Sequence, residues 1–314
     1  MGMPLFYRED GTFKIVQFTD LHWGEGNEND RRTRLLMERV LVEERPDLVV
    51  LTGDLIESGT CSVPVRSIRD AVAPMEESAT PWAAVFGNHD AEGNVTREEL
   101  MEALRGLRHG LTERGPASIA GVGNYVLRLH GRDGKPGHAL FFLDSGDYAE
   151  PPIGGYAAVA RDQIDWFARE SEALKEANGN TPVPALAFFH IPLPEYNDVW
   201  DFRECRGSKH EEICCPALNT GLFAAMVQQG NVVGTFVGHD HANDFMGELM
   251  GITLCYGRKT GYNNYAMEGF PNGARVILLE EGARGFRTWL RLDNGEVVTE
   301  QPAHRPEGRP AKRP

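Results

Sequence analysis

Five short polar segments of the chain carry side chains that can bind metal ions. These side chains are carboxylates, one amide and imidazoles, and they belong to Asp20, His22, Asp54, Asn88, His190, His239 and His241. Four of the segments directly follow a run of apolar, β-prone residues, and a shorter apolar run precedes the fifth. A buried strand explains each apolar run, but not why each run ends on the same few ligand types. Because strand ends along one edge of a sheet converge, we expect these side chains to meet.

This set of ligands suits two divalent metal ions. Carboxylate, amide oxygen and imidazole favour manganese, zinc, iron(II) or nickel, and the set contains no thiolate. Two ions about 3.5–4 Å apart need a bridging carboxylate, further protein ligands and open positions for water and substrate. For any single His or Asp, a surface or satisfied core position is the better interpretation. For all seven together, we expect two divalent ions per chain.

The order of the segments, DxH, GD, GNHD, H and GHxH, resembles the calcineurin-like metallophosphoesterase superfamily over residues 13–293. Longer stretches at 81–90, 141–148, 188–196 and 238–245 are similar to a branch grouped with the purple acid phosphatases. The resemblance implies one α/β domain, built as a four-layer αββα sandwich of two mixed sheets flanked by helices. It also implies a dinuclear metal site at the C-terminal ends of the strands.

The resemblance further implies which side chain binds which ion. Six ligands divide between the two ions, with Asp20, His22 and His241 on the first and Asn88, His190 and His239 on the second. Asp54 bridges both ions. His89, which directly follows Asn88, is the implied catalytic acid and faces the leaving group.

One position departs from the purple acid phosphatases proper. Those enzymes bind ferric iron through a tyrosine three residues after the bridging aspartate, and here that residue is Glu57. His22 is also retained where the purple enzymes differ. We therefore expect divalent ions and no tyrosinate-to-iron absorption band.

The function that these residues predict is metal-dependent hydrolysis of a phosphate ester. A hydroxide bridging the metals would attack phosphorus in line, both ions would stabilise the developing charge, and His89 would protonate the leaving oxygen. The branch resemblance favours phosphomonoesters. One alternative is a phosphodiesterase for cyclic-nucleotide, nucleic-acid-derived or phospholipid-derived diesters. Another is a catalytically inactive scaffold, although such relatives typically lose ligands that this chain keeps.

Further side chains are candidates for contact with substrate or for support of the ligands. The loop 191–216 follows His190, and its aromatic and basic residues could line a rim over the metals, with a solvated surface as the alternative. The substrate-binding candidates from this loop and from 255–265 are Arg206, Arg258, Lys259 and Tyr262. Asp90 and Asp240 stand beside histidines of the site. Each could fix a histidine tautomer or simply face solvent.

The net charge limits the classes of partner that we expect, and the cysteine content indicates the redox state of the compartment. A formal charge of −14 argues against a nucleic-acid footprint, which would show as a basic face, so we expect a small-molecule or peptide phosphate ester as the substrate. The five cysteines form no CxxC pair, which favours a reducing compartment. A disulfide from Cys205 to Cys214 or Cys215 is an open possibility, as is a small metal site of these cysteines with His210.

No signal or membrane segment is visible in the sequence. No apolar stretch approaches 18 residues, and the first residues lack a basic segment followed by an apolar one. We therefore expect no membrane association and a cytoplasmic location, although a secreted protein with its signal removed would look the same.

The remaining pattern indicates a single domain over residues 1–297. A βαβαβ order at the start predicts parallel strands covered by helices, and a hairpin with its turn at RDGKPG follows it. Expected strands lie at 13–19, 47–52, 81–86, 124–130, 138–144, 185–190, 251–256, 274–280 and 285–292, and expected helices begin near 30, 63, 96 and 160. Residues 298–314 are Pro-rich and lack apolar content, so we expect a disordered tail there.

Overall fold

The structure is a computed structural model, and it describes residues 4–306. Its larger sheet has nine strands, in the spatial order β1 (Leu5–Phe6), β5 (Tyr125–His130), β6 (Pro136–Phe142), β7 (Ala185–Phe188), β9 (Val232–Val237), β11 (Ile252–Tyr256), β10 (Met246–Leu249), β8 (Cys205–Arg206) and β15 (Ala303–His304). The six-stranded sheet has the order β14 (Val297–Val298), β13 (Phe286–Leu292), β12 (Gly273–Glu280), β2 (Thr12–Phe18), β3 (Leu48–Thr52) and β4 (Trp82–Val85).

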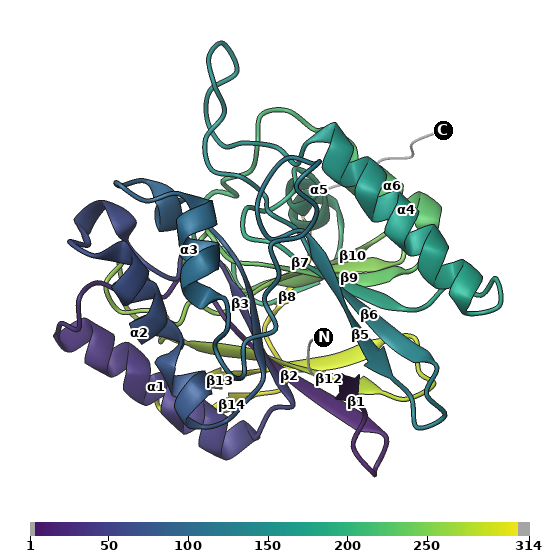
Figure 1. Cartoon of the computed structure of the whole chain (residues 1–314), viewed down its shortest axis with the longest axis horizontal. Helices are drawn as coiled ribbons and strands as arrows, with labels where there is room; N and C mark the ends of the chain where they lie inside the picture. The colour runs from purple at the N-terminus through teal and green to yellow at the C-terminus, as the bar shows by residue number, and fades with distance from the viewer. Residues whose placement is uncertain (1–3, 307–314) are drawn as a thin grey trace.

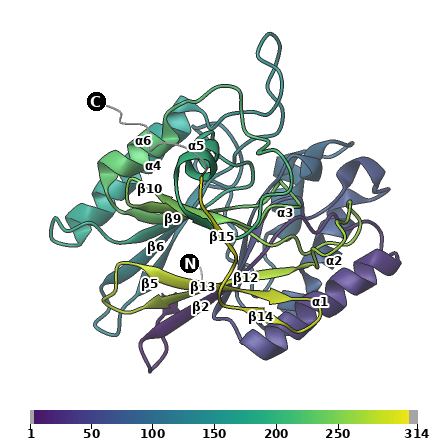
Figure 2. The ribbon, with the colours of Figure 1, turned by 180° about the vertical axis from the view of Figure 1, so that it is seen from behind.

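Helices cover the outer face of each sheet. The first three are α1 (Glu28–Glu44), α2 (Pro64–Glu77) and α3 (Arg97–Leu104), and they lie against the six-stranded sheet (Figure 1). The other three are α4 (Arg161–Ala177), α5 (Glu195–Phe202) and α6 (Leu222–Gln229), and they lie against the nine-stranded sheet, as the view from behind also shows (Figure 2). The four-layer αββα sandwich expected from the sequence is therefore confirmed.

Alternation along the strands builds the layers. Ile15 of β2 faces the core between the two sheets, and its neighbour Val16 faces the core under α1 and α2. The same alternation places Leu48 and Val50 of β3 between the sheets and directs Val49 outward to the helices. Because both faces are covered, the strand sequences read as continuous apolar runs. The pairs β2–β3 and β3–β4 are parallel, so their C-terminal ends lie at one edge.

The loop expected over 191–216 contains secondary structure. It includes helix α5 and strand β8, and the aromatic rings expected at a rim have other positions. Tyr196 is fully buried in the core, and Trp200 packs between Phe245 and the ring of His304. The reason is helical spacing, because Tyr196 and Val199 lie one turn apart and face the core together.

The expected disordered tail is wrong for residues 298–306. Strand β15 pairs with β8 and covers the last edge of the nine-stranded sheet, and Gln301 is buried. Backbone pairing, a stacked histidine and a buried amide anchor this segment, so its lack of apolar residues was misleading. Residues 307–314 lie outside the described part of the chain.

Two other expectations concern cysteines and membranes. All five cysteines are free, and Cys205 lies buried on β8, so the disulfide considered for it is not formed. Among residues 4–306, no helix is both long and apolar enough to cross a membrane.

Candidate metal centre

The expected ligands meet at the C-terminal ends of strands from both sheets. Asp20 follows β2, Asp54 follows β3 and Asn88 follows β4, all in the six-stranded sheet. From the nine-stranded sheet, His190 follows β7 and His239 follows β9. The centre thus lies where the edges of the two sheets face each other, and the predicted convergence is confirmed.

The side chains form two buried groups that share Asp54. Within each group the ligand atoms lie within 4.8 Å of one another, and the groups are Asp20, His22, Asp54, His241 and Asp54, His190, His239. Oδ2 of Asp54 lies 3.6 Å from Nε2 of His22 and 3.1 Å from Nε2 of His190. One carboxylate oxygen therefore faces a histidine of each group, which is the position of a bridging ligand.

Among residues 4–306, several buried atoms of these groups and of Asn88 have no hydrogen-bond partner. They are Oδ2 of Asp54, Oδ1 of Asn88, Nε2 of His239 and Nδ1 of His241. In addition, two pairs of ring nitrogens face each other at 3.2 Å, one between His22 and His241 and the other between His190 and His239. A buried polar atom without a partner costs about 1–3 kcal/mol. Divalent metal ions fit this set of oxygen and imidazole donors and would satisfy it.

Hydrogen bonds on the outer side of two histidines orient their rings. Nδ1 of His22 lies 2.7 Å from Oε2 of Glu57, and Nδ1 of His190 donates to the carbonyl of Thr52 at 2.8 Å. Because Nδ1 is used in this way, Nε2 of each ring faces Asp54. Such outer contacts are the usual means by which proteins fix the tautomer of a ligand histidine.

Four of the ligand residues adopt left-handed backbone conformations. The φ angles are 55° at Asp20, 46° at His22, 49° at Asp54 and 78° at His239. A non-glycine residue in such a conformation costs on the order of 1–3 kcal/mol and persists where the surroundings hold it. Backbone bonds hold these turns here, since His22 N–H donates to the carbonyl of Asp54 at 2.9 Å. The chain therefore maintains strain at the place where its ligands converge.

Close backbone approach explains one glycine of the site. A Cβ atom at Gly87 would lie 2.1 Å from Oδ1 of Asp54, so no other residue fits without moving the carboxylate of Asp54.

The electrostatics keep two carboxylates ionised and one histidine neutral, but they favour the protonated form of His190. Burial would lower the pKa of His190, and the charge of Asp54 outweighs this and raises it to about 9. Burial would raise the pKa of Asp20, but the hydrogen bond and charge of His241 lower it to about 2. Burial would likewise raise the pKa of Asp54, and the charge of His190 outweighs it, so this pKa lies well below its usual range. Burial lowers the pKa of His239 to about 3, and the neighbouring His190 adds to the effect. Both carboxylates are therefore ionised and His239 is neutral.

His89 lies beside the centre and is partly exposed. Its backbone N–H donates to Oδ1 of Asp54 at 2.9 Å, and its ring lies 5.1 Å from that of His22. Nδ1 faces two carboxylates, at 2.7 Å from Glu92 and 3.5 Å from Glu57. With Nδ1 held in this way, Nε2 is the nitrogen that can serve a substrate.

Asp90 and Asp240 support the site, but not by fixing a histidine tautomer. Asp90 accepts from the backbone N–H groups of Ile56 and Gly87 at 2.9 and 2.7 Å, and so joins the turns after β3 and β4. Asp240 accepts from the hydroxyl of Tyr256 at 2.5 Å. Burial raises the pKa of Asp90 to about 6 and that of Asp240 to about 7.

The structure gives three of the four substrate-binding candidates other contacts. Arg258 is buried, pairs with Asp244 at 2.5 Å and stacks on the ring of Phe270. Lys259 is also buried, and its Nζ donates to the carbonyl of Tyr265 at 2.6 Å. Charges buried in this way need a partner, and these partners are internal.

Tyr262 and Arg206 lie at other places on the molecule. Tyr262 donates to Asp293 at 2.6 Å, and its ring contacts Arg32 of α1. Arg206 is exposed on strand β8, which pairs with β10 and β15. Tyr262 therefore faces α1, on the side of the six-stranded sheet.

Tyrosines that the sequence did not single out surround the centre instead. Tyr156 packs edge-on against His239, with ring centroids 4.3 Å apart, and Tyr148 stacks on Tyr156. Tyr265 packs against His241 at 4.5 Å. Tyr148 and Tyr156 belong to a loop rich in Gly and Pro between β6 and α4. Aromatic residues in such a loop are the signal that could have identified them.

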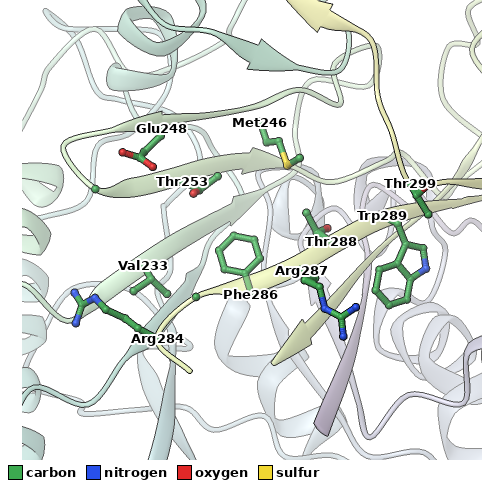
Figure 3. A pocket seen from close by; sticks show the side chains of 12 residues that line it. Val233, Met246, Glu248, Thr253, Arg284, Phe286, Arg287, Thr288, Trp289 and Thr299 are labelled. Carbon is green, nitrogen blue, oxygen red and sulfur yellow. The ribbon is translucent and has the colours of Figure 1, made fainter. Parts of the chain in front are cut away.

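A separate groove lies away from the metal ligands. Its volume is about 690 Å³, and Phe286, Arg287 and Trp289 of β13 line it together with Val233 and Met246 of the nine-stranded sheet (Figure 3). No metal ligand lines this groove, so the chemistry belongs to the strand-end cluster despite the size of the groove.

Comparison with known proteins agrees with this geometry. Residues 13–243 match the family described as calcineurin-like phosphoesterase. The chain is 36% identical to the probable inactive purple acid phosphatase 29 of Arabidopsis thaliana, over 92% of this chain and 85% of that protein. It is 32% identical to the phosphatase DCR2 of Saccharomyces cerevisiae, over 91% of this chain and 54% of that protein. A dimetal phosphatase from Danio rerio shares the fold, with a TM-score of 0.57 at 15% identity, over 88% of this chain and 98% of that chain.

Proposed function

The chain belongs to the calcineurin-like phosphoesterase family and is a phosphoric ester hydrolase, and on that premise we propose that it hydrolyses phosphate monoesters at two divalent metal ions. The observation that carries the proposal is the pair of buried ligand groups sharing Asp54, with unpartnered donor atoms on Asn88, His239 and His241. A protein that only kept the fold would gain nothing from leaving these atoms unsatisfied.

The proposed ligands are those expected from the sequence. Asp20, His22 and His241 would hold the first ion, Asn88, His190 and His239 would hold the second, and Asp54 would contact both. Two ions bound there supply Lewis-acid polarisation of the phosphoryl oxygens and a nucleophile from water at neutral pH. Glu57 and the carbonyl of Thr52 orient His22 and His190, so that the ring nitrogens stay in place.

His89 is the proposed general acid. Its backbone bond to Asp54 fixes its distance from the centre, and Glu92 holds the proton on Nδ1. Nε2 then donates a proton to the oxygen of the departing alcohol. Positioned acids of this kind contribute typically about 10²–10⁴-fold to the rate.

The name of the phosphatase DCR2 supports a phosphatase, whereas the word "inactive" in the names of three Arabidopsis relatives raises the scaffold alternative. An inactive scaffold has no need for the seven ligands and His89, all of which are present. We therefore favour catalysis, and phosphomonoesters over phosphodiesters.

Hydrolysis of nitrophenyl phosphate and of bis(nitrophenyl) phosphate tests the proposal. Chelator-treated protein should be inactive, and manganese or zinc should restore hydrolysis of the monoester with a higher kcat/KM than for the diester. No absorption band in the green should accompany activity, because Glu57 replaces the ferric-binding tyrosine. Metal-loaded protein that hydrolyses neither compound would favour the scaffold, and a preference for the diester would favour the phosphodiesterase.

A further inference from the structure

Two tyrosine–glutamate pairs stand on either side of the metal centre. On the side of the second metal group, the hydroxyl of Tyr148 donates to Glu92. The same hydroxyl accepts from Nδ2 of Asn88 at 3.1 Å. On the side of the first metal group, the hydroxyl of Tyr265 donates to Glu211. Each tyrosine therefore binds a carboxylate through its hydroxyl. The hydroxyl of Tyr148 also contacts Asn88, and the ring of Tyr265 packs against His241.

Both rings are open to solvent. Tyr148 is 48% exposed and Tyr265 is 55% exposed, which is unusual for side chains so close to buried ligands. Tyr265 lies 4.5 Å from the ring of His241, and Tyr148 stacks on Tyr156, which contacts His239. We call these exposed rings, Tyr148 and Tyr265, the tyrosine walls. His241 and His239 each carry an unpartnered nitrogen, and their rings contact Tyr265 and Tyr156 respectively.

The cations close to the centre are bound to internal partners. Arg97 pairs with Asp144 at 2.6 Å, Arg258 pairs with Asp244, and Nζ of Lys259 donates to the carbonyl of Tyr265. Two divalent ions would supply the positive charge that attracts the phosphoryl group. Beside the walls the charged side chains are instead the carboxylates Glu92 and Glu211, and the chain as a whole carries −14. On that side a further negative group is disfavoured and a positive group is favoured.

We propose that the tyrosine walls bind an ammonium group on the alcohol part of the ester, so that the enzyme prefers phosphate monoesters of amino or quaternary ammonium alcohols. This rests on the proposed function. A cation over the face of a tyrosine is attracted by the ring quadrupole. A phenol that donates its proton to a carboxylate has a more electron-rich ring, so the partners Glu92 and Glu211 strengthen that attraction.

A matched pair of substrates isolates the charge. In 3,3-dimethylbutyl phosphate a carbon atom replaces the ammonium nitrogen of phosphocholine, and the size is nearly unchanged. The ammonium group also makes the leaving oxygen less basic, an effect that substitutions of the walls leave in place. The manganese-loaded enzyme should hydrolyse phosphocholine with a kcat/KM about 2-fold to 30-fold higher, the range expected for cation–π contacts. The preference should appear mainly in KM, because the ammonium group contacts the walls equally before and during the reaction.

Substitutions assign the preference to the walls. Tyr265→Leu keeps an apolar side chain but removes the ring, and Glu211→Gln keeps the hydrogen-bond acceptor but removes the charge. Either change should move the ratio of the two kcat/KM values toward one. The matched control is Tyr262→Leu, because Tyr262 also donates to a carboxylate, Asp293, but faces α1. This control should retain the wild-type ratio.

The outcomes separate this inference from the proposed function. Hydrolysis of nitrophenyl phosphate together with a substrate ratio near one would overturn the inference and leave the proposed function standing. A high ratio that survives Tyr265→Leu and Glu211→Gln would also overturn it. Failure to hydrolyse any of the three esters in metal-loaded protein would overturn the proposed function and the inference with it.

Discussion

Nδ1 of His22 and Oε2 of Glu57 lie 2.7 Å apart, and this contact joins a metal ligand to the residue three positions after the shared Asp54. Glu57 also approaches Nδ1 of His89 at 3.5 Å. One half-buried carboxylate therefore orients His22, a proposed ligand of the first ion, and lies beside the proposed acid. The position occupied by a ferric ligand in the purple enzymes here supports a histidine.

Replacing Glu57 should weaken the first metal site selectively. We expect Glu57→Ala to lower the affinity for one of the two ions by about 10-fold to 100-fold, the usual effect of losing such an outer contact. Glu57→Gln keeps an acceptor oxygen and should lose less. Competition with a chelator measures the metal affinity of both variants. The control is Glu102→Ala on the exposed face of α3, which should keep the wild-type affinity. Unchanged affinity in Glu57→Ala would show that His22 needs no outer partner.

Asp54→Asn should damage both metal sites, because the side chain belongs to both ligand groups. Elemental analysis of protein prepared with excess manganese should give two ions per chain in the wild type and fewer in the variant. Asp90→Asn is the control, since Asp90 bonds to backbone N–H groups of neighbouring turns. It should keep both ions and lower the free energy of unfolding by about 1–3 kcal/mol. Full stoichiometry and activity in Asp54→Asn would contradict the bridging role.

His89→Ala should keep both metals and slow the enzyme according to the leaving group. Alkyl phosphates need a proton on a strongly basic leaving oxygen and should lose about 10²–10⁴-fold in kcat/KM. Nitrophenyl phosphate needs no proton and should lose much less. The measurement is kcat/KM for both esters on the same protein preparation, with the metal content determined in parallel. Equal losses would assign His89 to charge stabilisation at the phosphoryl group.

The metal ligands could be predicted from the sequence because each belongs to a short motif at the end of an apolar run. Asp20, Asp54 and Asn88 each follow a strand by two or three residues, and parallel pairing brings those ends together. The place of each ligand directly after a strand thus predicts where its side chain lies in the fold. The apolar runs predict strands covered on both faces, whereas the four-layer arrangement was implied by the family resemblance and not by the pattern.

The substrate-facing residues could not be predicted in this way. The sequence alone does not show that Arg258 has a partner. Its partner Asp244 comes from the segment after β9, and the fold brings the two side chains together. The exposure of Tyr148 and Tyr265 depends on the conformation of two loops, and loop conformation has no periodic sequence pattern from which it could be predicted. Residues 298–306 also carried no periodic pattern that would predict order, because their contacts are backbone pairing and the buried amide of Gln301.

Gln301 should contribute measurably to stability. Its amide donates to the carbonyl of Asp244 at 3.1 Å and accepts from the buried guanidinium of Arg275 at 3.3 Å. Gln301→Ala leaves Arg275 with a lost partner, so we expect the free energy of unfolding in urea to fall by about 1–3 kcal/mol. Arg305→Ala is the control, because its pair with Glu204 is exposed and worth at most about 1 kcal/mol. Equal effects would mean that the segment is not anchored through Gln301.

His138 should make stability depend on pH below neutrality. It is fully buried between the sheets, Tyr7 bonds to its Nδ1, and burial lowers its pKa from the ordinary 6.5 to about 4. Between these values the unfolded chain binds a proton that the folded chain does not. The stabilisation is therefore present above pH 6.5 and is lost as the pH falls toward 4, by roughly 3 kcal/mol at most.

His138→Gln isolates this contribution, because glutamine can still accept from Tyr7 but does not titrate. The free energy of unfolding in urea should be measured for both proteins from pH 7 to pH 4. Carboxylates that titrate in the same range are common to both, so they cancel in the difference. We expect the wild type to lose stability relative to the variant by roughly 3 kcal/mol as the pH falls. A difference that stays constant with pH would show that His138 is protonated as readily in the folded protein as in the unfolded chain.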